Sequence, residues 1–195
     1  TFNNYNKDKH LLEWLKKFEI ADDFNIVDVQ ALGIKVLQLI KNGFTVNIAD
    51  VGFGHMQILP LILKCIIEKP ALLIVEEPEA NLHPALQSKL AELFVFCFKT
   101  YGTQFIIETH SEYIIRKMQS ILAKKEIESN NVVIYYFNPE DSNKNNKKED
   151  ENENIVTTIY IEENGILTKS FGKGFYDEAD KLSLELLVIN NEQHN

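Results

Sequence analysis

The spacing of apolar residues predicts a helical start to the chain, followed by a β-rich segment. Leucine, tryptophan and phenylalanine recur at helical intervals over residues 10–18, which predicts a short amphipathic helix. Residues 26–40 and 44–49 are rich in β-branched and apolar side chains and predict two strands. The Asn42-Gly43 pair between them is typical of a tight hairpin turn. The first fifty residues therefore predict one helix and one β-hairpin.

The middle of the chain alternates between short apolar runs and longer segments with helical periodicity. A helix is predicted over about 55–67, with Pro60 as a strain point inside it. The runs "ALLIVE" and "TQFIIE" each predict a short buried strand, because their apolar residues are continuous. A helix beginning at Pro84 follows the first run, and Ser111 is placed to cap a helix after the second. This order predicts a parallel sheet with right-handed crossovers.

The last third of the chain has a different pattern. The segments "NVVIYYF" and "NIVTTIYI" predict two further strands. Between them, residues 139–154 include no large apolar side chain and predict a mobile loop. A turn is predicted at Asn164-Gly165 and a final amphipathic helix over about 176–190. The expected fold class is α/β: a parallel sheet flanked by helices, with a small antiparallel β element and a C-terminal helix.

Composition narrows the class of protein. An apolar fraction of 45% over 195 residues supports a real core, and a net charge of −9 argues against a protein that coats nucleic acid through its bulk charge. Cys65 and Cys97 lie inside apolar runs, which favours two buried thiols in a reducing compartment. No apolar run is long enough to span a bilayer, and the polar N-terminus has no signal peptide. We therefore expect a cytoplasmic protein with no membrane partner.

Polar residues follow both strands of the predicted parallel sheet. Glu76 and Glu77 end the first strand, and Glu108, Thr109 and His110 end the second. Ligands bind outside the carboxyl ends of such strands. Transfer of a phosphoryl group to water needs one carboxylate near magnesium, a second that orients the water, and a group that meets the γ-phosphate. The pattern favours this chemistry, while the competing interpretation of the two glutamates is a solvated acidic turn.

The order of these motifs resembles the C-terminal half of ABC-type ATPases. "LLIVEE" looks like a Walker B strand with its catalytic glutamate, "EANLHP" like the D-loop, "ETHS" like the H-switch and "DVGFGHMQILP" like the signature loop. More narrowly, "NIADVGFGHMQILP", "EEPEANLHP" and "THSEYIIRKMQ" resemble the prokaryotic AAA/ABC-type ATPases grouped with the overcoming-lysogenisation-defect family and with DNA-repair ATPases. The ending "GKGFYDEADKLSLELL" resembles a C-terminal domain of unknown function carried by some of them.

The resemblance implies a P-loop NTPase-like fold and a role for each matched residue. Glu76 takes the magnesium-associated Walker B position, Glu77 is the catalytic carboxylate and His110 is the switch histidine. The implied cofactors are ATP and Mg²⁺, and the implied assembly is a homodimer that closes around ATP through signature and D-loop. His55 also fits a helix start without chemistry. The residues implied to meet ATP are Val51, Gly52, Phe53, Gly54, His55, Asn81 and His83.

The chain departs from the family pattern in three ways. Glu76 stands where aspartate is usual, and Gly52 stands where the signature serine is usual. No GxxxxGK[ST] phosphate loop, the Walker A motif, occurs in the chain, and its first residue is Thr1. The chain thus resembles the C-terminal half of a longer ATPase, and the 195 residues alone are expected to be inactive.

The expected domains follow the motifs. They are the end of a helical and β insertion region (1–50), the C-terminal half of the ATPase core (51–130), a pair of strands with the loop 139–154 between them (131–170), and a C-terminal helical domain of unknown function (171–195). The family's company points to DNA metabolism or phage defence, with DNA or an effector protein as a partner. The alternative is an ATPase-like scaffold or interaction module without turnover.

Overall fold

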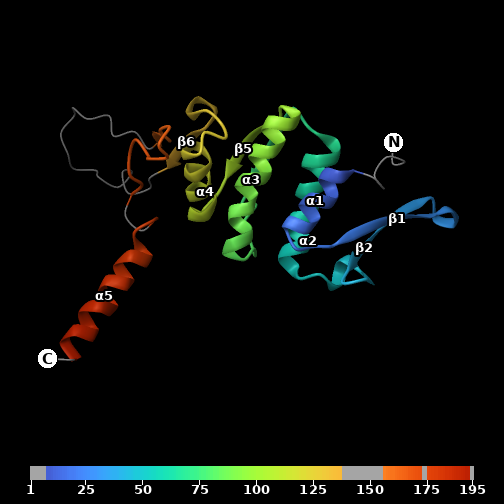
Figure 1. Cartoon of the computed structure of the whole chain (residues 1–195), viewed down its shortest axis with the longest axis horizontal. Coiled ribbons are helices and arrows are strands. Elements are labelled where there is room, and N and C mark those ends of the chain that lie inside the picture. Colours follow the sequence, from blue (N-terminus) through green and yellow to red (C-terminus); the bar gives the residue numbers. More distant parts are fainter. Residues whose placement is uncertain (1–7, 138–155, 173–174, 194–195) are drawn as a thin grey trace, which may run out of the picture. The chain divides into compact units, whose positions relative to one another are not determined.

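The computed structural model describes residues 8–137, 156–172 and 175–193 of a mixed α/β protein (Figure 1). The chain divides into two compact units, residues 1–117 and residues 118–195. The predicted loop 139–154 lies outside the described residues. The elements, in chain order, are α1 (Lys9–Lys17), β1 (Asp23–Val29), η2 (Gln30–Leu32), β2 (Ile34–Lys41), β3 (Phe44–Val46), η3 (Ile48–Asp50), α2 (Phe53–Leu63), η4 (Lys64–Glu68), β4 (Leu72–Glu76), α3 (Pro84–Tyr101), β5 (Gln104–Glu108), α4 (Glu112–Ala123), η5 (Ser129–Asn131), β6 (Val133–Phe137), β7 (Val156–Tyr160) and α5 (Glu178–Gln193).

The first helix confirms the prediction for residues 10–18 and begins one residue earlier. The Asp8 carboxylate caps it by accepting hydrogen bonds from the backbone N–H groups of His10, at 2.9 Å, and Leu11, at 3.2 Å. The apolar face of α1 is buried in the core of the first unit and packs on α2 and α3. There the indole ring of Trp14 meets the ring of Phe96, with 5.5 Å between centroids.

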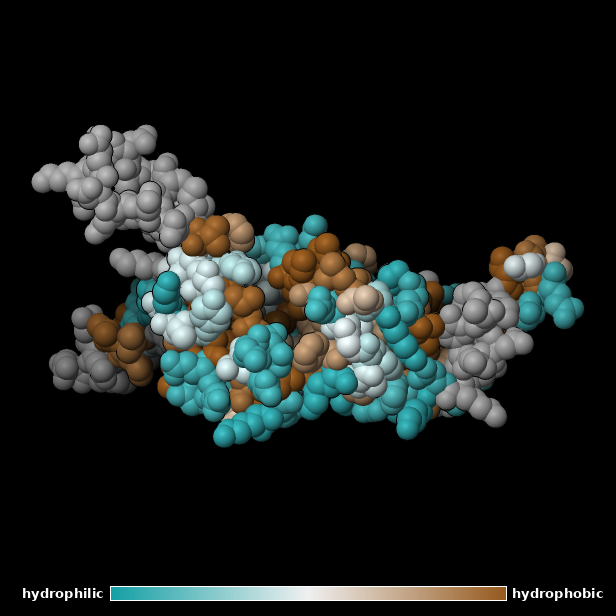
Figure 2. Space-filling model, turned by 90° about the horizontal axis from the view of Figure 1, so that it is seen from above, coloured by the Kyte–Doolittle hydropathy of each residue, from teal (hydrophilic) through white to brown (hydrophobic). Residues whose placement is uncertain are grey.

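The β-rich segment is a three-stranded antiparallel sheet in the order β1-β2-β3. The prediction of one strand over residues 26–40 was wrong, because the chain reverses at Gly33, where φ is +61°. That turn contains no Asn-Gly pair, so the local sequence predicts it only weakly. The second reversal confirms the Asn42-Gly43 hairpin, since both residues have positive φ, +52° and +79°. The tip of the β1–β2 hairpin, at the right-hand end of both views, exposes apolar surface to solvent (Figures 1 and 2).

The predicted helix over residues 55–67 corresponds to α2 followed by a π-helical turn, η4. Pro60 lies inside α2 and cannot donate the backbone hydrogen bond expected at its position. The π-helical turn ends at Lys69, which has left-handed backbone geometry with φ of +50°. Cys65 in this turn and Cys97 in α3 are both free and buried, which confirms the prediction of two buried thiols.

The parallel pair β4–β5, joined by α3, is the part of the fold that positions the candidate site. Its register pairs Leu72 with Gln104 and Glu76 with Glu108, so both strands end at the same edge. The prediction that these strands are buried on both faces was wrong. Exposure alternates along each strand, and Ile74 and Ile106 face solvent, because no described element covers that side.

The opposite face of this pair packs against α3. The ring centroids of Phe94 in α3 and Phe105 in β5 lie 4.9 Å apart. Pro84 occupies the first turn of α3, and Gly102 ends the helix with φ of +73°, both as expected for a helix start and stop. The residues of α3 that are buried are Leu86, Leu90, Ala91, Leu93, Phe94, Val95 and Cys97.

The second unit contains the antiparallel pair β6–β7, and its two strands confirm the prediction from "NVVIYYF" and "NIVTTIYI". The predicted turn at Asn164-Gly165 is also confirmed, with φ of +84° at the glycine. This turn packs on α4: the Gln119 amide donates to the Gly165 carbonyl at 2.8 Å, and a Cβ added at Gly165 would lie 2.7 Å from the Gln119 carbonyl. Glycine is therefore required here by both backbone conformation and space.

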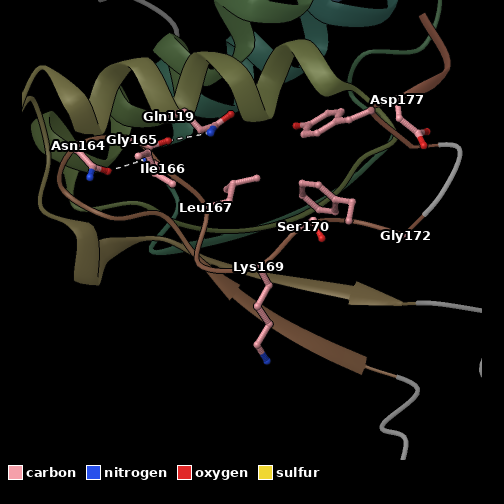
Figure 3. Close-up of a pocket in the computed structure, with 11 residues that line it drawn as sticks. Gln119, Asn164, Gly165, Ile166, Leu167, Lys169, Ser170, Gly172 and Asp177 are labelled. Carbon is pink, nitrogen blue, oxygen red and sulfur yellow. Dashed lines mark hydrogen bonds between the residues drawn. The ribbon is translucent and has the colours of Figure 1, made fainter. Parts of the chain in front are cut away.

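An open hollow of about 620 Å³ lies beside this turn in the second unit (Figure 3). Its lining combines the Gly165 turn with Phe171 and Tyr176, whose rings meet edge to face at 4.8 Å. Lys169 extends away from the other labelled side chains.

Across the described ranges, no helix is both long and apolar enough to cross a membrane.

Candidate functional site

The candidate site begins where the two parallel strands end. Glu76 and Glu108 are the last residues of β4 and β5, are paired in register and lie on the same exposed face. The chain then turns sharply at Glu77, whose φ of +42° is rare for a residue with a side chain. The Glu77 N–H donates to the Glu108 carbonyl at 2.9 Å, which ties the start of this turn to the neighbouring strand. The parallel register thus brings the two polar clusters of the sequence to one edge of the sheet.

The structure places the two predicted catalytic side chains next to each other. Glu77 Oε1 lies 3.6 Å from His110 Nε2, and their side chains are 57% and 73% exposed. One water molecule or phosphate oxygen can contact both groups at this separation. Because both side chains are largely solvated, their attraction contributes little to stability. The pair is therefore accessible to a ligand, and it changes the stability of the fold little.

Glu79, for which the sequence predicted no role, contacts the His110 backbone from a buried position. Its side chain is only 8% exposed, and its Oε1 accepts a hydrogen bond from the His110 backbone N–H at 2.7 Å. Its second oxygen, Oε2, is buried and has no partner among the described residues. A buried carboxylate is costly unless hydrogen bonds compensate. In the sequence Glu79 is only the third acid of "EEPE", a pattern typical of a solvated turn, so its burial could not be read from it.

The turn between β4 and α3, residues 77–83, is held by its own backbone and by its neighbours. Asn81 has φ of +59°, and its amide donates to Gln57 of α2 at 3.0 Å. His83 is the N-cap of α3, where its Nδ1 accepts from the Ala85 N–H at 3.3 Å. Asn81 and His83 are both exposed. Both side chains are therefore accessible at the end of the turn, and their D-loop role stays a prediction.

The predicted signature segment meets this turn within the same chain. A Cβ added at Gly54 would lie 2.5 Å from the Asn81 carbonyl, so only glycine allows the two backbones to approach this closely. Gly52 is the N-cap of α2 and provides no side-chain cap, which leaves the start of that helix suited to an anion. Gly52 and Phe53 are exposed, whereas the Val51 side chain is buried.

His55 belongs to the same segment but has a different environment. Its backbone N–H donates to the Gly52 carbonyl at 2.9 Å, as expected in the first turn of a helix. Its side-chain Nε2 is buried and has no partner among the described residues. The structure thus places His55 in the first turn of α2, where the residue is half-buried and its Nε2 is covered.

The acidic residues at the strand ends offer Mg²⁺ few ligands. Within the described ranges, no three His, Cys, Asp or Glu side chains gather into a metal-binding group. Mg²⁺ is commonly held by one or two carboxylates together with substrate phosphates and waters, so it does not require such a cage. Glu76, exposed at the strand end beside Glu108, fits this way of binding.

Comparison with known proteins places most of these residues in one family. A family model described as "AAA domain, putative AbiEii toxin, Type IV TA system" matches residues 3–116. A second model, described as "Protein of unknown function (DUF3696)", matches residues 127–186. No protein with a curated description matches the chain. The AAA match supports a nucleotide-binding domain of the ATPase type and is compatible with a P-loop fold. Because it covers more than half of the chain, the protein belongs to this family of AAA domains.

Proposed function

We propose that this chain carries the water-activating part of an ATP-hydrolysing site. The observation that carries the proposal is the Glu77–His110 pair, 3.6 Å apart at the ends of two parallel strands. Ligands of open parallel sheets bind at this edge. The AAA match over residues 3–116 supports nucleotide as the ligand, and the ABC-type resemblance of the motifs supports the assignment of individual roles.

The two residues of the pair, Glu76 and the start of α2 each have a task in this proposal. The Glu77 carboxylate accepts a hydrogen bond from the attacking water and orients it, or takes its proton. His110 Nε2 donates to a γ-phosphate oxygen or to the same water. Glu76 holds Mg²⁺, directly or through its waters, and Mg²⁺ when bound neutralises charge on the phosphates. The uncapped start of α2, at Gly52, contacts a phosphate through backbone N–H groups.

The groups that cradle the phosphates are supplied from outside these residues in our proposal. The 195 residues contain no GxxxxGK[ST] motif. The exposed apolar face of β4–β5, formed by Leu72, Ile74 and Ile106, also supports further layers, since parallel sheets are normally covered on both faces. We therefore expect the 195-residue chain to show neither tight ATP binding nor Mg²⁺-dependent hydrolysis; measurable turnover by this chain would contradict that expectation.

The proposed assembly is a homodimer around ATP. The residues that support it are Phe53, Asn81 and His83, because they are exposed and lie in two segments that meet at Gly54. In this assembly, the signature segment of one subunit completes the nucleotide site of the other. DNA metabolism or phage defence is the setting we propose, from the family resemblance, with DNA or an effector protein as the further partner.

The test uses the longest open reading frame that contains these residues. Glu77→Gln should lower kcat for MgATP hydrolysis by about 100-fold or more, since a positioned general base contributes roughly 10² to 10⁴. The variant should still bind ATP and should accumulate as an ATP-bound dimer, seen by light scattering. Glu163→Gln, at an exposed glutamate of the second unit, is the matched control and should leave kcat unchanged. Equal turnover by wild type and Glu77→Gln would overturn the assignment.

A second candidate function, an interaction module without turnover, is favoured by the apolar surface that the described residues leave uncovered. The apolar face of β4–β5 and six large apolar residues of α5 are exposed. Patches of this kind often mark contact surfaces. The same experiment separates the two candidates, because a wild-type protein that binds a partner but never hydrolyses ATP would favour the module.

A further inference from the structure

The Glu77–His110 pair cannot fix its own geometry. Both side chains are mostly exposed, and a contact between two exposed polar side chains at 3.6 Å gains little free energy against the side-chain entropy that it must give up. Yet the two residues come from segments more than thirty positions apart in the chain. The parallel register and the bond from the Glu77 N–H to the Glu108 carbonyl bring these segments together, and side-chain contacts between the turn 77–83 and the segment 109–111 can fix the remaining freedom of His110.

The first such contact is made by Glu79. It belongs to the turn, and its Oε1 accepts from the backbone N–H of His110 itself at 2.7 Å. The bond is short, its acceptor is a carboxylate and the side chain is 8% exposed, so water competes for it poorly. Within the turn, the Leu82 N–H donates to the Glu79 carbonyl at 3.0 Å, which fixes the residue that holds the histidine.

The second contact is made by Gln87, one turn into α3. Its Nε2 donates to the Leu82 carbonyl at 2.9 Å, and its Oε1 accepts from Ser111 Oγ at 2.6 Å. Ser111 Oγ also caps α4 by accepting from the Ile114 N–H at 3.3 Å, as the sequence predicted. One glutamine side chain thus joins the end of the turn, the residue after the histidine and the start of α4.

We propose that Glu79 and Gln87 are positioning residues that hold His110 at its distance from Glu77. This inference rests on the proposed function and adds to it a polar clamp, defined as the bonds Glu79–His110, Gln87–Leu82 and Gln87–Ser111. Neither residue of the clamp touches the reacting atoms. A displacement of about 1 Å in a reacting group can cost roughly 100-fold in rate, so contacts behind the site can decide turnover.

Three variants separate the hydrogen bonds from the shape of the side chains. Glu79→Met and Gln87→Met keep side-chain length and remove the bonds. Glu79→Gln keeps an amide oxygen that can accept from the His110 N–H, and so should rescue. Leu15→Ala, in the fully buried face of α1, is the control for general loss of stability.

The first measurement needs no nucleotide and uses the 195-residue chain. Hydrogen exchange at the His110 amide, followed by ¹H–¹⁵N NMR, should be about tenfold faster or more in Glu79→Met, the size expected when a bond to a charged acceptor is lost. It should stay near the wild-type rate in Glu79→Gln and in Glu77→Gln. An unchanged His110 amide in Glu79→Met would overturn the clamp.

The second measurement uses MgATP hydrolysis by the longest open reading frame. Glu79→Met and Gln87→Met should lower kcat by about 10- to 100-fold with little change in KM, and Glu79→Gln should restore most of it. Leu15→Ala should lower Tm without this selective loss of kcat. A wild-type enzyme that turns over while both Met variants retain full kcat would overturn the clamp alone. A wild type without turnover would instead overturn the proposed function, and the amide exchange would still decide whether the clamp holds His110.

Discussion

The helices α3 and α5 are similar in length and in their number of Leu, Ile, Val and Phe residues, seven and six, yet one is buried and the other is not. α3 has 18 residues, of which seven are buried. α5 has 16 residues, and its large apolar side chains are between 41% and 62% exposed: Leu182, Leu184, Leu186, Leu187, Val188 and Ile189. The number of apolar residues therefore does not determine whether a helix is part of the core.

The difference follows from where the apolar residues stand around each helix. In α3, Leu86, Leu90, Leu93 and Cys97 are spaced by three or four positions and form one stripe that the first unit covers. In α5, at about 100° per residue, Leu182, Leu186 and Ile189 form one stripe and the other three large residues form another on the opposite side. The prediction of an amphipathic last helix was therefore wrong in its pattern, although its position was nearly right. A helix with two opposite apolar stripes needs cover on both sides.

The largest expected effect that tests this comparison is in α3. Leu90→Ala should lower the free energy of unfolding of the first unit by about 2–5 kcal/mol, because it leaves a cavity at a fully buried position. Urea unfolding followed by the fluorescence of Trp14, the one tryptophan in the chain, measures this unit. A loss below about 1 kcal/mol would mean that the site can collapse around the smaller side chain and that α3 is not part of a tight core.

A smaller effect is expected at the end of α3. Burial raises the pKa of Tyr101 from 10.0 to about 12, and the negative charge of Asp8 adds to the shift. The neutral phenol is therefore favoured by the folded state, so this contribution to stability is complete below pH 10 and is lost as the pH rises through about 12.

The measurement compares the free energy of unfolding of wild type with that of Tyr101→Phe as a function of pH. The variant also loses the 2.8 Å hydrogen bond to His10 Nδ1, which should cost about 1 kcal/mol near neutral pH. Between pH 10 and 12 the wild type should lose more stability than the variant, so that their curves converge. Parallel curves across this range would show that Tyr101 is solvated, and that the buried character of α3 ends before its last residue.

The smallest effect is expected in α5. Leu187→Ala, at a position 59% exposed, should change the free energy of unfolding of the chain by no more than about 0.5 kcal/mol. Circular dichroism at 222 nm during urea titration provides the measurement, with Leu90→Ala as the buried counterpart. A loss of 2 kcal/mol or more at Leu187 would remove the contrast, because it would show that α5 is covered in solution.

Elsewhere in the chain, features set by neighbouring residues were predicted, whereas a feature that depends on which element covers a face was not. The capping roles of Pro84 and Ser111 and the turns at Asn42-Gly43 and Asn164-Gly165 were predicted and confirmed, because each depends on a few neighbouring residues. The exposed face of β4–β5 was not predicted. The continuous apolar runs "ALLIVE" and "TQFIIE" predict burial on both faces, whether or not another element covers them. The reversal at Gly33 was missed for a local reason: apolar residues flank it without any common turn pair.

For the candidate site, the sequence by itself determined which residues are the candidates, since Glu76, Glu77 and His110 follow apolar strands in the order proposed for hydrolysis of a nucleotide. The tertiary structure decided their geometry. Only the parallel register places Glu77 beside His110, and only folding buries Glu79 and brings Gln87 between Leu82 and Ser111. The physical reason is range: strand ends, caps and turns depend on neighbours in the chain, whereas burial and hydrogen bonds between distant segments exist only once those segments have packed together.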